Sequence, residues 1–317
     1  MTETLSVFAD ASGDGEDGVR RVGYLCRRAS GVVVKFSVTF GRMHPRIWTE
    51  AAEAADRLGF ESIWLPEHLV LPMAMAGSPY AGADHPPVPP TTQLFDPASL
   101  LSFVAARTST VRLGTYVYLL GLRHPFITAR SFATLDWLSG GRAVIGAGAG
   151  WLRSEWQALG IDPSTRGARL DEAIGVCRRL WTERTVAHDG AYFPFDEVAF
   201  EPKPVQQPIP IFIGGESAVA LRRAGRLGDG WIGMGATPDT AAAAVAVIRS
   251  HREEAGRQGA PFEVTVGGAC TSEEDVAAWE TAGVDRLIVS PWQRTAEVLG
   301  AMESFAARFI ATSGIES

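Results

Sequence analysis

The sequence predicts an α/β fold, a TIM-type (β/α)8 barrel with long loops over its C-terminal face. From Lys35 onward, strand-like and helix-like segments alternate, and strands that alternate with helices pair in parallel. About eight such units follow one another within 317 residues, a length that suits one barrel of roughly 250 residues with added loops. The same alternation is compatible with an open doubly wound sheet, but this number of units favours closure. We therefore expect one domain over residues 34–312.

Hydrophobic periodicity places four units in the first half of the chain. It predicts strands at 35–40, 61–65, 111–119 and 142–147, and helices at 47–58, 97–106, 126–138 and 170–181. The first helix illustrates the argument, because Ile47, Ala51 and Leu58 lie on one helical face and Gly59 ends the pattern. The second half repeats the alternation, with strands at 209–213, 230–234, 262–266 and 286–289 and helices at 218–227, 237–256, 273–282 and 295–310.

Two connections are longer than ordinary turns. Residues 66–96 follow the second strand, so they leave the C-terminal face of the barrel, where active sites lie, and form a candidate lid. Residues 182–207 join a helix to a strand and start on the opposite face, which makes them the weaker candidate.

Composition excludes several classes of partner. The chain has 29 basic and 36 acidic residues, a net charge of −7, so its surface repels nucleic acid and anionic membranes. No stretch approaches 18 consecutive apolar residues, and we expect a soluble cytoplasmic protein without membrane contact. Its three cysteines (Cys26, Cys177 and Cys270) are widely spaced without a CxxC pattern, which argues against a disulfide framework and a zinc site. Residues 1–33 are rich in small polar residues, and we expect a disordered extension there.

Glu67 and His68 directly follow the second predicted strand, where barrel enzymes place acids and bases. A histidine beside a carboxylate suits proton transfer. The structural alternative, in which His68 caps the strand and Glu67 is solvated, fits this dipeptide equally well. The pair is a poor metal site, because adjacent residues point to opposite sides and no HxxxH or HExxH pattern adds ligands. We expect no metal.

Two glycine-rich turns are candidates for binding a ligand through the backbone. The run 146–150 reads GAGAG after the fourth strand, and Gly214-Gly215-Glu216-Ser217 precedes a helix. Glycines let N–H groups approach a ring or a phosphate, and the start of a helix favours anions. A tight turn at the barrel rim explains the first equally well, and a Ser217 helix cap is the alternative for the second.

Taken together, the segments resemble the luciferase-like monooxygenase superfamily, especially its deazaflavin (coenzyme F420)-dependent oxidoreductase branch. The matching pieces, in order, are AAEAADRLGFESIWLPEHL, DPASLLSFVAARTSTVRLGTYV, RHPFITARSFATLDWLSGGRAVIGAGAGW, RGARLDEAIGVCRRLWTE, KPVQQPIPIFIGGES and RRAGRLGDGWIGMG. Each piece is generic alone, and the ordered set, from about Lys35 to beyond Trp231, carries the resemblance.

The resemblance implies a deazaflavin or flavin ring at the C-terminal mouth and names the residues around it. Glu67 and His68 are expected beside the ring as catalytic residues. The residues expected to bind the cofactor are Thr115, Tyr116 and Val117, in a bulge that often holds a non-proline cis peptide, Gly148, Ala149, Gly150 and Ser154, and Gly214, Gly215, Glu216 and Ser217 at the cofactor phosphate. The resemblance also makes a homodimer an expectation.

The implied function is hydride transfer between coenzyme F420 and a small organic substrate, with His68 and Glu67 moving the accompanying proton. The alternative is a two-component monooxygenase similar to alkanesulfonate monooxygenase, which takes reduced FMN (FMNH2) from a flavin reductase and uses O2. The sequence separates the two poorly, and it lacks an obvious basic cluster for the polyglutamate tail of F420. A non-catalytic flavin-binding protein and a metal-dependent barrel hydrolase are weaker alternatives.

Overall fold

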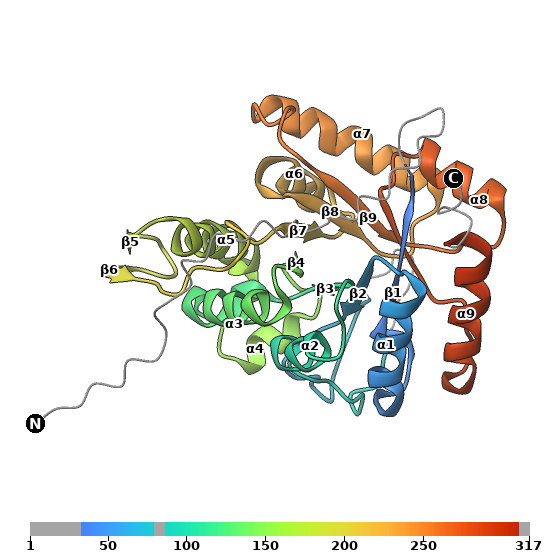
Figure 1. The fold of residues 1–317 in the computed structure, drawn as a ribbon. Helices are drawn as coiled ribbons and strands as arrows, with labels where there is room; N and C mark the ends of the chain where they lie inside the picture. The colour runs from blue at the N-terminus through green and yellow to red at the C-terminus, as the bar shows by residue number, and fades with distance from the viewer. Residues whose placement is uncertain (1–32, 79–85, 311–317) are drawn as a thin grey trace, which may run out of the picture.

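A closed barrel of parallel strands forms the centre of the molecule (Figure 1). The computed structural model describes residues 33–78 and 86–310. Within these ranges the strands follow the order β1-β10-β9-β8-β7-β4-β3-β2, and β1 pairs with both β10 and β2. Their bounds are β1 Lys35–Thr39, β2 Ser62–Leu65, β3 Arg112–Thr115, β4 Ala143–Ala147, β7 Ile211–Gly214, β8 Gly230–Gly233, β9 Glu263–Gly267 and β10 Arg286–Val289. The predicted (β/α)8 barrel is confirmed, and the predicted extension at 1–33 lies almost wholly outside the described residues.

Helices surround the strands on the outside of the barrel (Figure 1). They are α1 Trp48–Leu58, α2 Pro97–Ala105, α3 Pro125–Ser139, α4 Arg153–Ala158, α5 Arg166–Thr182, α6 Ala218–Leu227, α7 Pro238–Glu254, α8 Glu273–Thr281 and α9 Val298–Phe309. Single 3-10 turns lie at Phe40–Arg42, Pro45–Ile47, Leu120–Leu122, Pro163–Thr165 and Thr295–Glu297. The ends follow local chemistry: α1 stops at Gly59, whose φ of +81° suits glycine, and Ser217 caps α6 by accepting a hydrogen bond from Ala220 N.

The structure corrects the predicted elements in three places. The strand expected at 111–119 ends at Thr115, because the chain leaves the ladder there and only Tyr118 returns, in an isolated bridge to Ala147. The connection at 182–207 contains an antiparallel hairpin, β5 Thr185–His188 and β6 Phe195–Ala199, which lies outside α5 (Figure 1). Helix α4 was also not expected, because six residues are too few for a clear periodic pattern.

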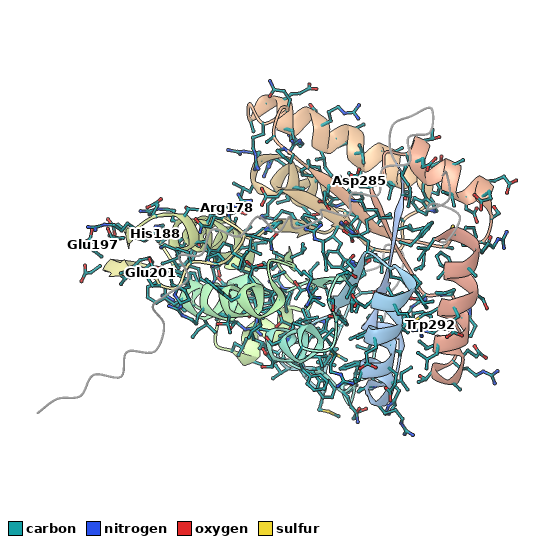
Figure 2. All side chains as sticks on the ribbon, in the orientation of Figure 1. Arg178, His188, Glu197, Glu201, Asp285 and Trp292 are labelled. Atoms are coloured by element: carbon teal, nitrogen blue, oxygen red, sulfur yellow. The ribbon has the colours of Figure 1, made fainter. Side chains whose placement is uncertain are left out.

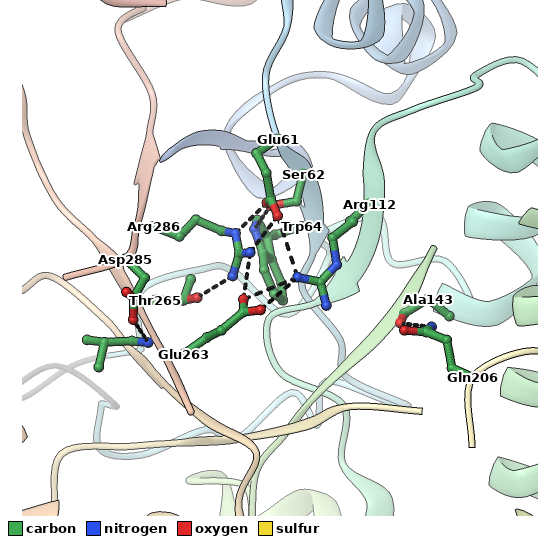
Figure 3. Close-up of polar contacts among 11 residues, drawn as sticks. Glu61, Ser62, Trp64, Arg112, Ala143, Gln206, Glu263, Thr265, Asp285 and Arg286 are labelled. Atoms are coloured by element: carbon green, nitrogen blue, oxygen red, sulfur yellow. Dashed lines mark hydrogen bonds and ion pairs between the residues drawn. The ribbon is translucent and has the colours of Figure 1, made fainter. Parts of the chain in front are cut away.

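The N-terminal end of the barrel holds a buried ionic cluster (Figure 3). The guanidinium of Arg286, 1% exposed, binds Glu61 and lies 2.7 Å from Glu263 Oε2, while Arg112 lies 3.1 Å from the same oxygen. Coulombic attraction and hydrogen bonds from Arg286 outweigh the desolvation of Glu61 and lower its pKa to about 2. These residues stand where β2, β3, β9 and β10 begin, so the cluster connects the first residues of these strands.

An apolar layer fills the barrel between this ionic cluster and the C-terminal mouth. It consists of Trp64, Val144, Phe212, Ile232 and Ile288, with Tyr116 and Val117 packed against it. A Cβ added at Gly114 would lie 2.4 Å from the Trp64 ring, so glycine is required beside that indole. The layer separates the ionic cluster from the residues at the C-terminal strand ends.

Candidate functional site

The ends of β3, β4 and β7 bring predicted site residues together around one side chain. Val117 lies between the two glycine turns, since a Cβ added at Gly148 would lie 2.4 Å from Val117 Cγ2 and one at Gly214 would lie 2.6 Å from Val117 Cγ1. Real Cβ atoms do not approach so closely, so both positions require glycine. Segments 115–117, 148–150 and 214–217, far apart in sequence, therefore meet at the barrel mouth.

The turn after β3 is attached to strands on both sides of it. Thr115 Oγ1 donates a hydrogen bond to Gly146 O at 2.9 Å, and Tyr116 Oη donates to Gly233 O at 2.8 Å. The peptide bond between Tyr116 and Val117 is cis, as the family resemblance implies for this bulge. Thr115 is fully buried, whereas Tyr116 and Val117 are half-buried at the mouth.

The turn after β7 leads directly into the N-terminus of α6. Gly215 has a φ of +112°, which suits glycine, and its carbonyl accepts a hydrogen bond from Trp231 Nε1 at 2.9 Å. Glu216 Oε1 accepts from Met234 N at 2.6 Å, which ties its carboxylate to the end of β8. Ser217 Oγ accepts from Ala220 N at 3.2 Å as the helix cap. The turn thus places Gly214–Ser217 at the N-terminus of α6, where unpaired backbone N–H groups and the helix dipole favour an anion.

Glu67 is buried and binds residues that follow β3. Its Oε2 accepts a hydrogen bond from Leu119 N at 2.6 Å, and its Oε1 forms an ion pair with Arg123. Burial raises the pKa of Glu67, and the guanidinium of Arg123 opposes that shift. Both carboxylate oxygens therefore have partners within the protein, and they attach the end of β2 to the segment beyond the cis bond.

His68 points to a different partner from its neighbour. His68 Nδ1 lies 2.8 Å from Glu155 Oε2, and the imidazole meets the ring of Trp151 edge-on, with ring centroids 5.8 Å apart. The side chain of His68 is 15% exposed, whereas that of Glu155 is fully buried. The predicted pair thus separates into two carboxylate sites, Glu67 with Arg123 and Glu155 with His68.

Glu155 and Trp151 are not among the residues predicted for the site from the sequence. A signal exists for Glu155, because Leu152, Glu155, Trp156 and Leu159 lie on one face of a helical turn. An acidic residue on an otherwise apolar face needs a buried partner. The missing information was the existence of α4, which places this face against the segment after β2.

Ser154 lies beside a cavity at the start of α4. The cavity has a volume of about 440 Å3 and is lined by Ala74, Ala76, Gly77, Ser78, Trp151, Arg153, Ser154 and Gln157. Among the described residues, the buried Ser154 Oγ has no hydrogen-bond partner. A volume of this size suits a small ligand. Ala149 and Gly150 lead into this region, and Gly150 has a φ of +74°.

The candidate lid begins at this site. Leu69 N and Val70 N donate hydrogen bonds to Glu155 Oε1 at 2.6 Å and 3.3 Å, so the start of the 66–96 connection is attached to α4. Met73, further along, is 80% exposed. Residues 79–85 of the connection lie outside the described residues.

Residues 33–78 and 86–310 contain no group of three or more His, Cys, Asp or Glu side chains that could hold a metal ion. Within the same ranges, every helix is too short or too polar to span a bilayer.

Comparison with protein families gives a match to the model of the luciferase-like monooxygenases over residues 28–311. The chain belongs to the luciferase-like monooxygenase family. Both the predicted fold class and the predicted enzyme class, a luciferase-like oxidoreductase or monooxygenase, are confirmed by this family assignment and by the closed barrel.

This luciferase-like enzyme is similar, in sequence or in fold, to proteins described with either cofactor. It is 33% identical over 237 residues to an F420-dependent glucose-6-phosphate dehydrogenase of Kineococcus radiotolerans, covering 71% of this chain and 64% of the relative. Its fold is similar to an F420-dependent secondary alcohol dehydrogenase in complex with an F420-acetone adduct (TM-score 0.71, 18% identity, 88% and 98% of the two chains). It is also similar to a type II Baeyer-Villiger monooxygenase of Pseudomonas putida in complex with FMN (TM-score 0.56, 17% identity, 74% and 67%).

Proposed function

We propose that this luciferase-like enzyme is an F420-dependent oxidoreductase that transfers a hydride between the deazaflavin and a small organic substrate. The observation that carries the proposal is His68, held against a buried carboxylate at the mouth where the β3 bulge and the two glycine turns meet. An imidazole in this place suits the proton that accompanies hydride transfer. The identity to an F420-dependent relative favours F420 over FMN.

The residues at the mouth fit a ring that carries a phosphate. The N-terminus of α6, with Gly214, Gly215, Glu216 and Ser217, would hold the phosphate through backbone N–H groups and the serine hydroxyl, while the Glu216 carboxylate stays on Met234 N. Half-buried Tyr116 and Val117, on the turn begun by Thr115, would lie behind the ring. Ser154 Oγ, which lacks a partner among the described residues, would donate to it from the segment after Gly148, Ala149 and Gly150.

In this mechanism the bound deazaflavin supplies the hydride chemistry and the chain supplies position and proton transfer. His68 would give or take the proton at the substrate, and the 66–96 connection would exclude water. Glu67 was predicted to share the proton transfer. Its contacts with Leu119 N and Arg123 favour a second role, in which it holds the turn behind the ring.

The alternative is an FMN-dependent two-component monooxygenase that receives FMNH2 from a flavin reductase and uses O2. The similarity to an FMN-bound monooxygenase supports it. A phosphate site at α6 and an apolar bulge serve either cofactor, so their geometry does not separate the two.

Location and assembly are part of the proposal. We expect a cytoplasmic enzyme that does not bind nucleic acid, because its net charge of −7 repels polyanions. We also expect a homodimer. Large apolar side chains on the outer faces of α2 and α3 support this, with Phe103 54%, Ile127 58% and Leu138 62% exposed.

The deciding experiment is titration of the protein with F420 and, separately, with FMN, followed by tryptophan fluorescence. Tight binding of F420 and much weaker binding of FMN would support the proposal, and the reverse order would favour the monooxygenase. Binding of neither would contradict both.

A matched pair of helix-cap variants locates the phosphate. Ser217→Ala and Thr237→Ala each remove the cap of one helix, α6 or α7. We expect Ser217→Ala alone to weaken cofactor binding, by about tenfold for one lost hydrogen bond to a charged group. Equal cofactor affinity in the two variants would mean that the phosphate does not bind at the N-terminus of α6.

A further inference from the structure

The carboxylate of Glu155 binds both a side chain and the backbone of the segment after β2. Its Oε2 lies 2.8 Å from His68 Nδ1, and its Oε1 accepts hydrogen bonds from Leu69 N at 2.6 Å and Val70 N at 3.3 Å. Glu155 is fully buried, so water does not compete for these oxygens. The Glu155 carboxylate therefore fixes the imidazole of His68 relative to the backbone of the next two residues, Leu69 and Val70.

This contact also decides which ring nitrogen carries the proton. An ionised carboxylate only accepts hydrogen bonds, so the neutral imidazole of His68 must carry its hydrogen on Nδ1. Its Nε2 then bears a lone pair and is able to take a proton. The edge-on ring of Trp151, 5.8 Å away between centroids, packs against the imidazole and restricts its rotation.

We propose that Glu155 is the positioning residue of the reaction, which holds His68 in the Nδ1–H tautomer so that Nε2 exchanges a proton with the substrate. The proposal rests on the hydride-transfer function above. In the oxidative direction the bound deazaflavin would supply the hydride acceptor for the substrate carbon. His68 Nε2 would take the proton of the adjacent hydroxyl or amine, so that the substrate is left with a C=O or C=N bond. Reduction reverses each step. The carboxylate of Glu155, held by Leu69 N and Val70 N, would stabilise the imidazolium.

The test exploits the difference between a carboxylate and an amide of the same shape. In Glu155→Gln the amide oxygen still accepts from Leu69 N and Val70 N, while the NH2 group faces His68 Nδ1 and donates to it. The ring hydrogen then lies on Nε2, so this nitrogen no longer has a lone pair that can accept a proton. The shape of the side chain at position 155 changes little. Replacing the carboxylate that orients a catalytic histidine by its amide is known to give this wrong tautomer.

The chain offers a matched control in a second histidine–glutamate pair. His188 Nε2 lies 3.2 Å from Glu172 Oε1, and that carboxylate also accepts from Tyr192 N and Phe193 N. This pair joins α5 to the β5–β6 hairpin and takes no part in the proposed reaction. Glu172→Gln therefore makes the same chemical change in a similar contact elsewhere in the molecule.

The first readout is the tautomer of His68, which needs no cofactor. The full-length protein, with its six histidines labelled with ¹⁵N, is studied by long-range ¹H–¹⁵N NMR, and His68→Gln assigns the signal. We expect the hydrogen on Nδ1 in the wild type and in Glu172→Gln, and on Nε2 in Glu155→Gln. A wild-type His68 that carries its hydrogen on Nε2, or a tautomer unchanged in Glu155→Gln, would overturn the proposal even if F420 binds.

The second readout is turnover with F420 and a screened alcohol or amine. We expect Glu155→Gln to lower kcat by about 10²- to 10⁴-fold with KM nearly unchanged, the usual worth of a general base, and Glu172→Gln to leave kcat unchanged. An equal decrease of kcat in both variants would contradict the positioning role. A change in KM without a decrease in kcat would contradict it too. If the protein binds no F420, the proposed function fails, while the tautomer result still tests the contact with Glu155.

Discussion

Two histidine–glutamate pairs, one at the barrel mouth and one under the hairpin, are built in the same way. In each, a helix supplies a carboxylate that binds an imidazole nitrogen and the N–H groups of two consecutive loop residues. Glu155 extends from α4 and Glu172 from α5. Figure 2 shows His188 beside α5 and the hairpin, outside the barrel, with Glu197 and Glu201 further along the same flank.

The pairs differ in which nitrogen is bound and in what surrounds it. Glu155 binds Nδ1 of a histidine that directly follows a barrel strand, whereas Glu172 binds Nε2 of a histidine in the hairpin. Glu155 is fully buried, and the side chain of Glu172 is 13% exposed. The ring of Phe195 lies 5.9 Å from that of His188 between centroids, and 6.4 Å from that of His124. Similar local chemistry thus attaches a hairpin to α5 in one place, and in the other it holds the imidazole to which we assign the proposed proton transfer.

The largest expected difference between the two pairs appears when the imidazole of each is removed. We expect His68→Gln to lower the rate of hydride transfer by about 10²- to 10⁴-fold, because the general base is lost. His188→Gln should leave the rate unchanged, since that ring lies on the flank of α5. The change in F420 absorbance in a single turnover measures both. A slow His188→Gln variant with normal cofactor affinity would mean that the hairpin takes part in the reaction.

The N-terminal end of the barrel differs from the mouth in how its buried carboxylate responds to pH. The pKa of Glu61 falls to about 2 in the folded state, from 4.5, so its stabilising effect is complete above about pH 4.5 and is lost as the pH falls towards 2. The loss is on the order of 3 kcal/mol. Burial instead raises the pKa of Glu67, so its ionisation reduces stability as the pH rises through the folded-state value.

Urea unfolding between pH 2 and 7 measures both effects. Glu61→Gln should flatten the rise in the free energy of unfolding between pH 2 and 4.5, and Glu67→Gln should not. The same slope below pH 4.5 in wild type and Glu61→Gln would show that the ionic cluster does not govern acid stability.

The smallest expected effects come from two glycines, one in each region. Gly148→Ala should destabilise the fold by about 1–3 kcal/mol, because the new Cβ overlaps Val117. Gly175→Ala in α5 meets no atom within 4 Å and should stabilise the protein by about 0.5–1 kcal/mol. Thermal unfolding separates the two variants by the sign of the change in Tm. A stable Gly148→Ala variant with normal cofactor affinity would show that Val117 is free to move.

Elements with local sequence signals have the bounds predicted for them, whereas the hairpin was missed. The helix Ala218–Leu227 and the strand Arg286–Val289 have the predicted bounds, because periodicity, a serine cap and flanking glycines are local signals. The hairpin was missed because residues 182–207 were interpreted as a connection. Its contacts with Glu172 and Phe126 come from other elements, which local patterns do not show.

The sequence by itself determined the alternation of strands and helices, the closed barrel and the position of Glu67 and His68 at its mouth, because these follow from periodicity and from where a strand ends. Only the tertiary structure decided what each of the two side chains binds. Leu119, Arg123 and Glu155 lie 52, 56 and 87 residues away from their partners, and folding brings them within hydrogen-bond distance. A hydrogen bond depends on ångström-scale geometry that packing sets, so the partners of Glu67 and His68 follow from the folded chain and not from local sequence patterns.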